Sequence, residues 1–569
     1  MYKGFKIFAT VVALQFVAVQ FQAQATGRIP VRAKHGMVVS ASHYASEVGV
    51  KILKKGGNAV DAAVATAFAL AVTWPSAGNL GGGGFLVYHG ADGFVTAFDF
   101  REKAPLAATE TMYLDENGEI RDRSNHRGLL AVGVPGTVAG LFLAHQRLGR
   151  LPWEAVVQPA IELAEKGIRV TWGLHDGMRY LQRVAAEYPS TLNVFLKNGR
   201  EPYEPGEVWK QPDLAKTLKR IKKYGPDGFY KGKTAKLIAE FMRENGGIIT
   251  EEDLARYEAK ERQPIHGTYR GYDVYAMCPP SSGGVALVEM LNILEGFNLA
   301  AMGHNSGMYM HILAEAMRRA FADRARYLGD PDFNPDMPIE RLISKAYARE
   351  LRQTIDLFRA SKSDPIKFND AYESTETTHL SVVDREGNAV SLTYTLEQSY
   401  GSKIVVEGAG FLLNNEMGDF NPIPGRTDTT GLIGTPPNLI APEKRMLSSM
   451  TPTIVAKDGK PVLVIGSPGG RTIINTVLQV ILNVIDHGMN VGEAVEAGRI
   501  HHQWLPDVLF IEKGATTLDS QRLVEMMGHR VRIRRGFQGR AMGIWIDHEK
   551  GLLMGAADTR SPDGAAMGY

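Results

Sequence analysis

Helix-like and strand-like segments alternate along this chain and its strands come in hairpins, so the sequence predicts an α+β layered sandwich rather than a doubly wound parallel sheet. Two alanine-rich helices are predicted over residues 43–72, broken at Gly56 and Gly57. The segments FLVYHG and GFVTAFDF that follow predict two strands joined by a turn at residues 91–93.

The second half of the chain holds further helices and a hairpin. A helix is predicted from its cap at Ser306 to Leu328, because the apolar residues repeat at helical spacing. Residues 361–376 are polar and predict a linker. Later segments predict a hairpin over residues 379–393 with its turn at 384–388, strands over GFLLNN (410–415) and PTIVAKDGKPVLVIG (452–466), and a helix over 471–485.

The first 25 residues have the composition of a secretory signal, with Lys3 and Lys6, an apolar run and Ala-Gln-Ala ending at Ala25. The run is shorter than the roughly 20 residues that span a bilayer, so cleavage after Ala25 is preferred over a membrane anchor. The mature chain is then expected in the periplasm or the medium. Because both lysines leave with the signal, its net charge falls from +2 to 0, which indicates neither a nucleic-acid nor a membrane partner.

Cysteine usage limits the chemistry further. Cys278 is the single cysteine, and no tight cluster of histidine, cysteine and carboxylate residues is visible in the sequence. The sequence therefore predicts no disulfide framework, no metal and no cofactor. Since Cys278 lies beside two prolines, we interpret it as a buried residue rather than a nucleophile.

The polar linker ends directly before Thr377, in the stretch TETTHLSVVDREGNAVSLTYT. A symmetric hairpin sets Thr377 opposite Thr395, with Cβ atoms about 5 Å apart. That geometry alone is more typical of an ordinary cross-strand threonine pair. A chain cut before Thr377, however, has an α-amino group that can accept the hydroxyl proton and activate this weak nucleophile.

The segment GSPGGRTII supplies candidate donors for an oxyanion. Gly469 and Gly470 follow a predicted strand and precede a helix, where backbone N–H groups and the helix dipole favour negative charge. A phosphate-binding loop is the rival interpretation, but the lysine and hydroxyl residue of that motif are missing. The run GNLGGGGF at residues 78–85 fails the same comparison.

Together these segments resemble the gamma-glutamyltransferase (gamma-glutamyltranspeptidase) family of the N-terminal nucleophile hydrolase superfamily. GNLGGGGF, DFREKAP, PPSSGG, TTHLSVV, NNEMGDF, LSSMTPTIV and GSPGG match in order over nearly the whole mature chain. The resemblance implies an αββα four-layer sandwich formed jointly by two subunits. It also implies a precursor that cleaves itself between Glu376 and Thr377 into a large subunit (26–376) and a small one (377–569).

The resemblance further implies that Thr377 attacks the γ-carbonyl of a γ-glutamyl compound such as glutathione and passes the acyl group to water, an amino acid or a dipeptide. Thr395 would steady the Thr377 hydroxyl, and Gly469 and Gly470 would form the oxyanion hole. The substrate α-carboxylate is expected on Arg101, Ser448 and Ser449, and the α-ammonium on Glu416 and Asp419. From the residues alone, Arg101 is better interpreted as a local ion-pair partner of Asp99 or Glu102.

Two departures from the family pattern affect these expectations. Glu397 stands where many members have asparagine, and we keep it as a substrate-binding residue because a carboxylate accepts from an ammonium. The loop 421–446 resembles a lid but contains no aromatic residue, so a larger share of hydrolysis is predicted. His379 is less well placed as a base than the amine of Thr377, and His501 and His502 are interpreted as structural.

Two other functions are compatible with the sequence. A cephalosporin or glutaryl-amide acylase would share the TTH and GSPGG segments but accept side chains without an α-ammonium. Glu416 and Asp419 argue against that acylase, since two carboxylates would repel such an acyl group or lie unused. An exported binding protein that never processes is the third possibility.

Overall fold

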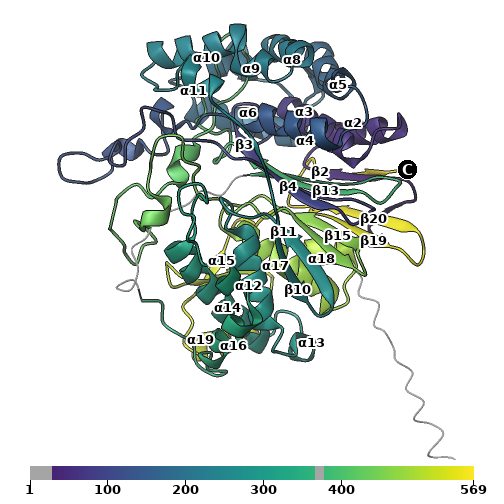
Figure 1. Cartoon of the computed structure of the whole chain (residues 1–569), viewed down its shortest axis with the longest axis vertical. Helices are drawn as coiled ribbons and strands as arrows, with labels where there is room; N and C mark the ends of the chain where they lie inside the picture. The colour runs from purple at the N-terminus through teal and green to yellow at the C-terminus, as the bar shows by residue number, and fades with distance from the viewer. Residues whose placement is uncertain (1–27, 365–376) are drawn as a thin grey trace, which may run out of the picture.

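The computed structural model describes residues 28–364 and 377–569, so the predicted signal and Glu376 lie outside the described residues. Two antiparallel sheets pack face to face, and helices cover the outer face of each (Figure 1). The predicted α+β sandwich, with layers in the order αββα, is confirmed. Within the described ranges, no helix is both long and apolar enough to cross a membrane.

The first sheet contains the predicted nucleophile hairpin. Its central strands are buried along their whole length, because a helical layer covers one face and the other sheet covers the opposite face. In order across the sheet the strands are β21 (Ala565–Gly568), β2 (Met37–Ser40), β12 (Thr378–Val383), β13 (Ala389–Thr395), β3 (Gly83–His89), β4 (Val95–Phe100) and β9 (Lys260–Arg262).

The second sheet contains the strand that leads into the predicted oxyanion turn. It contacts the first sheet through β12, β13 and β2, and these contacts form the centre of the core. In order its strands are β1 (Val31–Ala33), β20 (Leu552–Ala557), β19 (Met542–Asp547), β15 (Lys460–Gly466), β14 (Thr453–Lys457), β11 (Tyr272–Ala276) and β10 (Ile265–Tyr269).

Helices cover the first sheet on its outer face. The predicted alanine-rich pair is confirmed as α2 (His43–Lys54) and α3 (Ala59–Thr73). Every residue of α3 is buried, since this helix packs between the sheet, α2 and α5, and Asn58 caps its start. The main neighbouring helices are α4 (Thr137–Leu148), α5 (Trp153–Lys166), α6 (Trp172–Val184), α8 (Pro212–Tyr224) and α10 (Gly232–Glu244).

The second sheet is covered by a separate group of helices (Figure 1). Ser306 caps the predicted helix as expected, accepting from the Tyr309 N–H. The helices are α12 (Gly283–Leu294), α14 (Gly307–Tyr327), α16 (Lys345–Gln353), α17 (Thr472–Ile485), α18 (Val491–Glu496) and α19 (Leu518–Met526).

Two predicted strands differ from the structure. Residues 410–415 form only single bridges, because their backbone hydrogen bonds go to three separate loops: Leu413 N–H to Ile404, Asn414 N–H to Gly81 and Asn415 N–H to Leu396. The predicted strand over residues 452–466 is two strands, β14 and β15, since Asp458 and Gly459 adopt positive φ and reverse the chain.

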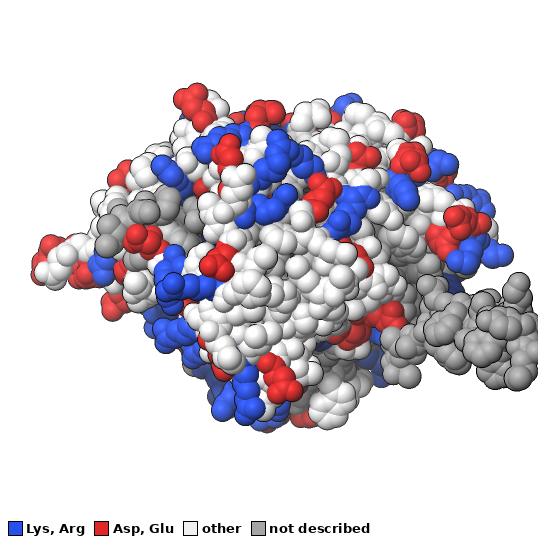
Figure 2. Space-filling view, turned by 90° about the horizontal axis from the view of Figure 1, so that it is seen from below, with Lys and Arg blue, Asp and Glu red and all other residues white. Residues whose placement is uncertain are grey.

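The surface charge is mixed. Seen from below, basic and acidic side chains are interspersed around a broad region that carries neither (Figure 2). Cys278 is buried, and burial raises the pKa of its thiol to about 12, so it stays protonated and has little nucleophilic character at neutral pH.

Candidate active site

The hairpin β12–β13 has the predicted register. Thr378 pairs with Tyr394 and Val383 with Ala389, which sets Thr377 opposite Thr395 at the open end of the hairpin. Both threonines line one narrow cavity. Its other lining residues come from distant segments and include most of the predicted site: Glu397, Glu416, Asp419, Ser448, Ser449, Met450, Gly470 and Ile473.

Arg101 lies directly after β4, and its guanidinium is completely buried beside this cavity. It pairs with Glu416 through Nη1 and with Asp419 through Nη2, and its Nε donates to the Met446 carbonyl at 3.2 Å. Burial lowers the pKa of Arg101, but these carboxylates outweigh it and raise the pKa overall. The residues predicted for opposite ends of the substrate therefore contact one another.

The local partners considered for Arg101 contribute less. Glu102 Oε2 lies 3.4 Å from Arg101 Nη1, whereas Asp99 accepts only the Arg101 backbone N–H and directs its carboxylate to Arg262 at 2.7 Å. The interpretation of Arg101 as mainly a local ion-pair partner is wrong, because Glu416 and Asp419 approach it from a segment more than 300 residues away.

Carboxyl groups outnumber cationic groups around the cavity. Burial raises the pKa of Glu102 and of Glu416, although Arg101 opposes both shifts. Four carboxyl groups lie here against Arg101 and His126, and the raised pKa of Glu102 and Glu416 favours their uncharged forms as long as no further cation is bound. A small cation would therefore be stabilised here. The carboxylates concerned are Glu102, Glu397, Glu416 and Asp419.

Glu397 is held at the cavity in a left-handed conformation, with φ at +77°. Its backbone N–H donates to Thr395 Oγ1 at 2.8 Å, which links it to the hairpin. Its carboxylate is buried, and neither oxygen makes a hydrogen bond within the described residues. Its Oε1 lies 3.2 Å from His126 Nδ1. Such a carboxylate is a ready acceptor for an ammonium.

His126 was not predicted. Burial lowers the pKa of its imidazole, but the Glu397 carboxylate more than offsets this, so the pKa is raised overall. No sequence signal marks His126, because it lies in an irregular loop and reaches Glu397 only through tertiary packing.

Ser448 and Ser449 precede β14 on an extended segment. Ser448 Oγ accepts from the Met450 N–H at 3.1 Å, and Ser449 Oγ accepts from Arg324 Nη2 at 3.1 Å. Arg324, on α14, also donates to Ser282 Oγ at 2.8 Å. It was missed as a supporting residue, although its segment ADRARYLGDPDF belongs to the family resemblance.

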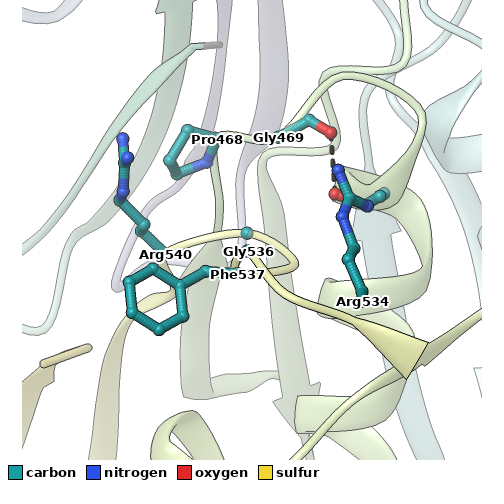
Figure 3. A pocket seen from close by; sticks show the side chains of 8 residues that line it. Pro468, Gly469, Arg534, Gly536, Phe537 and Arg540 are labelled. Carbon is teal, nitrogen blue, oxygen red and sulfur yellow. Dashed lines mark hydrogen bonds between the residues drawn. The ribbon is translucent and has the colours of Figure 1, made fainter. Parts of the chain in front are cut away.

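The glycine pair connects β15 to α17. Gly469 and Gly470 have φ of +136° and +56°, and neither N–H donates a hydrogen bond inside the described parts of the chain. Gly470 lines the cavity of Thr377, whereas Gly469 lines a neighbouring pocket with Pro468, Thr472, Arg534, Phe537 and Arg540 (Figure 3). Two N–H groups in a turn that borders the cavity of Thr377 suit a developing oxyanion.

The histidines near the site are held in internal networks. His379 lies with Nδ1 2.8 Å from Thr393 Oγ1 and Nε2 3.0 Å from Ser381 Oγ, and burial lowers its pKa to about 3. His501 contacts Asn475 and Gln503, and burial lowers its pKa to about 3 as well. His502 lies 3.2 Å from Asp507. These contacts agree with structural roles.

One side-chain cluster has the composition of a metal site: His311, Glu315 and His529, all buried. His311 Nδ1 and His529 Nε2 already lie 2.8 Å apart, and Glu315 pairs with Arg318 and Arg319. Although burial raises the pKa of Glu315, the two arginines hold it at about 2. Two adjacent guanidinium groups make this a poor place for a cation.

An αββα sandwich with a threonine directly before a central strand, in a cavity that a glycine turn borders, is the arrangement of the N-terminal nucleophile hydrolases. Residues 45–568 match the family described as Gamma-glutamyltranspeptidase, and the chain belongs to that family.

Relatives span nearly the whole chain. The glutathione hydrolase proenzyme of Escherichia coli (strain K12) is 50% identical over 543 residues, covering 95% of this chain and 93% of the relative. A cephalosporin acylase from Bacillus halodurans superposes with a TM-score of 0.84 at 29% identity, covering 97% of this chain and 99% of that chain. Gamma-glutamyltranspeptidase from Helicobacter pylori superposes with a TM-score of 0.55 at 47% identity, covering 56% of this chain and 91% of that chain.

Proposed function

We propose that this chain is a self-cleaving γ-glutamyl acyl transferase and glutathione hydrolase whose nucleophile is Thr377. The observation that carries the proposal is the hairpin register, which sets Thr377 opposite Thr395 in a cavity that Gly470 also lines. The large subunit is residues 26–376 and the small subunit residues 377–569.

The chemistry follows from the free amine that cleavage before Thr377 creates. This amine accepts the proton of the Thr377 hydroxyl while Oγ bonds to the γ-glutamyl carbonyl carbon. The Gly469 and Gly470 N–H groups stabilise the oxyanion. When the C–N bond breaks, the proton passes to the leaving amine. Water or an acceptor amine then attacks the ester, and the Thr377 oxygen regains a proton.

Substrate selection rests on the charges around the cavity. The α-ammonium is bound by Glu397, Glu416 and Asp419, because a bound cation stabilises the charged form of these carboxyl groups. The α-carboxylate binds Arg101, with Ser448 and Ser449 adding hydroxyl donors. In the free enzyme Arg101 pairs with Glu416 and Asp419. When the zwitterionic substrate binds, its carboxylate and ammonium groups replace part of these contacts.

A test of processing uses a denaturing gel and mass spectrometry on wild type, Thr377→Ala and Thr378→Val. Wild type is expected as two fragments, the smaller beginning at Thr377, and Thr377→Ala as one chain. Thr378→Val is the matched control, because the Thr378 hydroxyl is buried and makes no hydrogen bond within the described residues; it should process. An intact wild type would overturn the proposal and favour a binding protein.

The acylase alternative is favoured by the likeness to the Bacillus halodurans cephalosporin acylase. A glutaryl group differs from a γ-glutamyl group in lacking the α-ammonium, so it leaves the buried carboxylates without a cation. Rates on a γ-glutamyl anilide are therefore expected to exceed those on a glutaryl anilide by at least about tenfold, the cost of one lost charge-assisted contact. The reverse order would establish the acylase.

The mature protein is exported, and its acyl-enzyme is open to water. The mature protein is periplasmic or secreted, and N-terminal sequencing is expected to give Thr26. Because the loop 421–446 has no aromatic residue, water reaches the acyl-enzyme easily, and hydrolysis takes a large share of the product. Product analysis at neutral pH with a dipeptide acceptor tests this, and strongly dominant transfer would contradict it.

A further inference from the structure

A second pocket of about 300 Å³ adjoins the oxyanion turn, and neither Arg101 nor Asp419 lines it. This volume is at the lower end of the roughly 300–1,000 Å³ that small-molecule sites occupy. The two cavities share one turn: Gly470 and Ile473 line the inner cavity of Thr377, and Gly469 and Thr472 line the outer pocket.

The outer pocket carries positive charge. Figure 3 shows Arg534 on one side of the pocket and Arg540 on the other, with Phe537 next to Arg540 and below Pro468. No acidic residue lines the pocket within the described ranges. The N-terminus of α17 begins at Thr472 beside it and adds the positive end of a helix dipole.

Arg534 is the last residue of strand β18 (Val531–Arg534), and hydrogen bonds to two neighbouring segments hold the loop that follows it and leads to Arg540. The Gln538 N–H donates to Glu512 Oε1 at 2.7 Å, and the Arg540 N–H donates to Ser467 Oγ at 2.9 Å. A Cβ on Gly469 would lie 3.2 Å from Gly539 Cα, so this loop and the oxyanion turn are in close contact. The loop between Arg534 and Arg540 is therefore held against the oxyanion turn.

Arg534 is half-buried, and burial lowers the pKa of its guanidinium. The carboxylate that opposes this shift, Glu512, is already engaged by Arg560 at 2.7 Å. An anion in the pocket would restore the charge compensation that Arg534 lacks.

We propose that this pocket binds the C-terminal carboxylate of the peptide that leaves from, or attacks, the γ-glutamyl group. The inference rests on the proposed function. When the acyl part occupies the cavity of Thr377, the adjoining outer pocket with Arg534 and Arg540 is available to the amine side of the carbonyl. The Cys-Gly part of glutathione and a dipeptide acceptor share this carboxylate, and Phe537 offers an apolar surface to the intervening side chain.

The test compares glycylglycine with its C-terminal amide as acceptors for a γ-glutamyl anilide donor. Wild type is expected to prefer the acid, by kcat/KM, about tenfold, as one partly exposed charge-assisted contact allows. Arg534→Gln and Arg540→Gln should each reduce this preference several-fold, and added salt should reduce it in wild type. Arg535→Gln, an exposed arginine of the same loop that does not line the pocket, is the matched control and should keep the preference.

Release of the aniline by wild type reports separately on the proposed function. If wild type releases no aniline, the nucleophile assignment fails. If it releases aniline but does not distinguish the acid from the amide, or if Arg535→Gln changes the preference as much as Arg534→Gln and Arg540→Gln do, the carboxylate pocket is overturned. Because the preference is a ratio measured on active enzyme, a variant that folds poorly does not imitate the expected result.

Discussion

The imidazole Nδ1 of His126 lies 3.2 Å from Glu397 Oε1, and both side chains are buried. This contact joins the loop before α4 to Glu397, the second residue after the nucleophile hairpin. Burial opposes protonation of His126, but the Glu397 carboxylate dominates and raises its pKa above the usual value of 6.5. The pair is therefore charged at lower pH and weakens as His126 loses its proton.

The free energy of unfolding is expected to depend on the protonation of His126. A histidine whose pKa is raised on folding adds stability that is full below the unfolded pKa, near 6.5, and is lost as pH rises through the folded pKa. Chemical denaturation is expected to show His126→Gln destabilised by roughly 1 kcal/mol at pH 6 and by less at pH 8.5. The Thr377→Ala background, expected to remain one chain, avoids subunit dissociation. An equal loss at both pH values would contradict the pairing.

Arg101→Lys tests whether the two guanidinium nitrogens of Arg101 are both needed for substrate binding. Lysine keeps the charge but cannot donate from two fixed nitrogens to Glu416 and Asp419 at once. We expect KM for a γ-glutamyl anilide to rise about tenfold or more, with self-cleavage retained. Arg101→Met instead leaves buried carboxylates uncompensated, and should lower the free energy of unfolding by about 3–5 kcal/mol. If Arg101→Met is as stable as wild type, the buried ion pairs of Arg101 are refuted.

Gly469→Ala tests the oxyanion turn. Gly469 has φ of +136°, and an added Cβ would lie 2.5 Å from Thr472 Oγ1, so the turn must shift. Displacing one backbone donor is expected to reduce kcat about 100-fold, with a smaller effect on KM. Steady-state kinetics on the processed enzyme measure this. An unchanged kcat would remove Gly469 from the oxyanion hole.

His379→Gln separates structure from catalysis. Since burial holds the pKa of His379 at about 3, its ring is neutral throughout the neutral range and supplies no titrating base there. The variant should cleave itself and keep the wild-type shape of the pH–rate profile. Loss of the Thr393 and Ser381 contacts should cost about 1–3 kcal/mol of stability. Disappearance of one limb of the profile would instead indicate a catalytic histidine.

Local patterns in the sequence were sufficient to predict several elements. The hairpin register followed from its turn length and symmetric strands, and the two alanine-rich helices followed from periodicity and from the glycines that separate them. The segment 410–415 was predicted wrongly because it has the apolar composition of a strand, while its backbone partners are loops. Composition does not report where hydrogen bonds go.

The sequence by itself determined that Thr395 faces Thr377 and that Gly469 and Gly470 form a turn between a strand and a helix, since both features depend on hydrogen bonds between near neighbours in the chain. Only the tertiary structure decided that Arg101 pairs with Glu416 and Asp419, that His126 meets Glu397, and that two arginines flank the outer pocket. These contacts join distant segments, and they form because the packing of two sheets brings their loops to one edge.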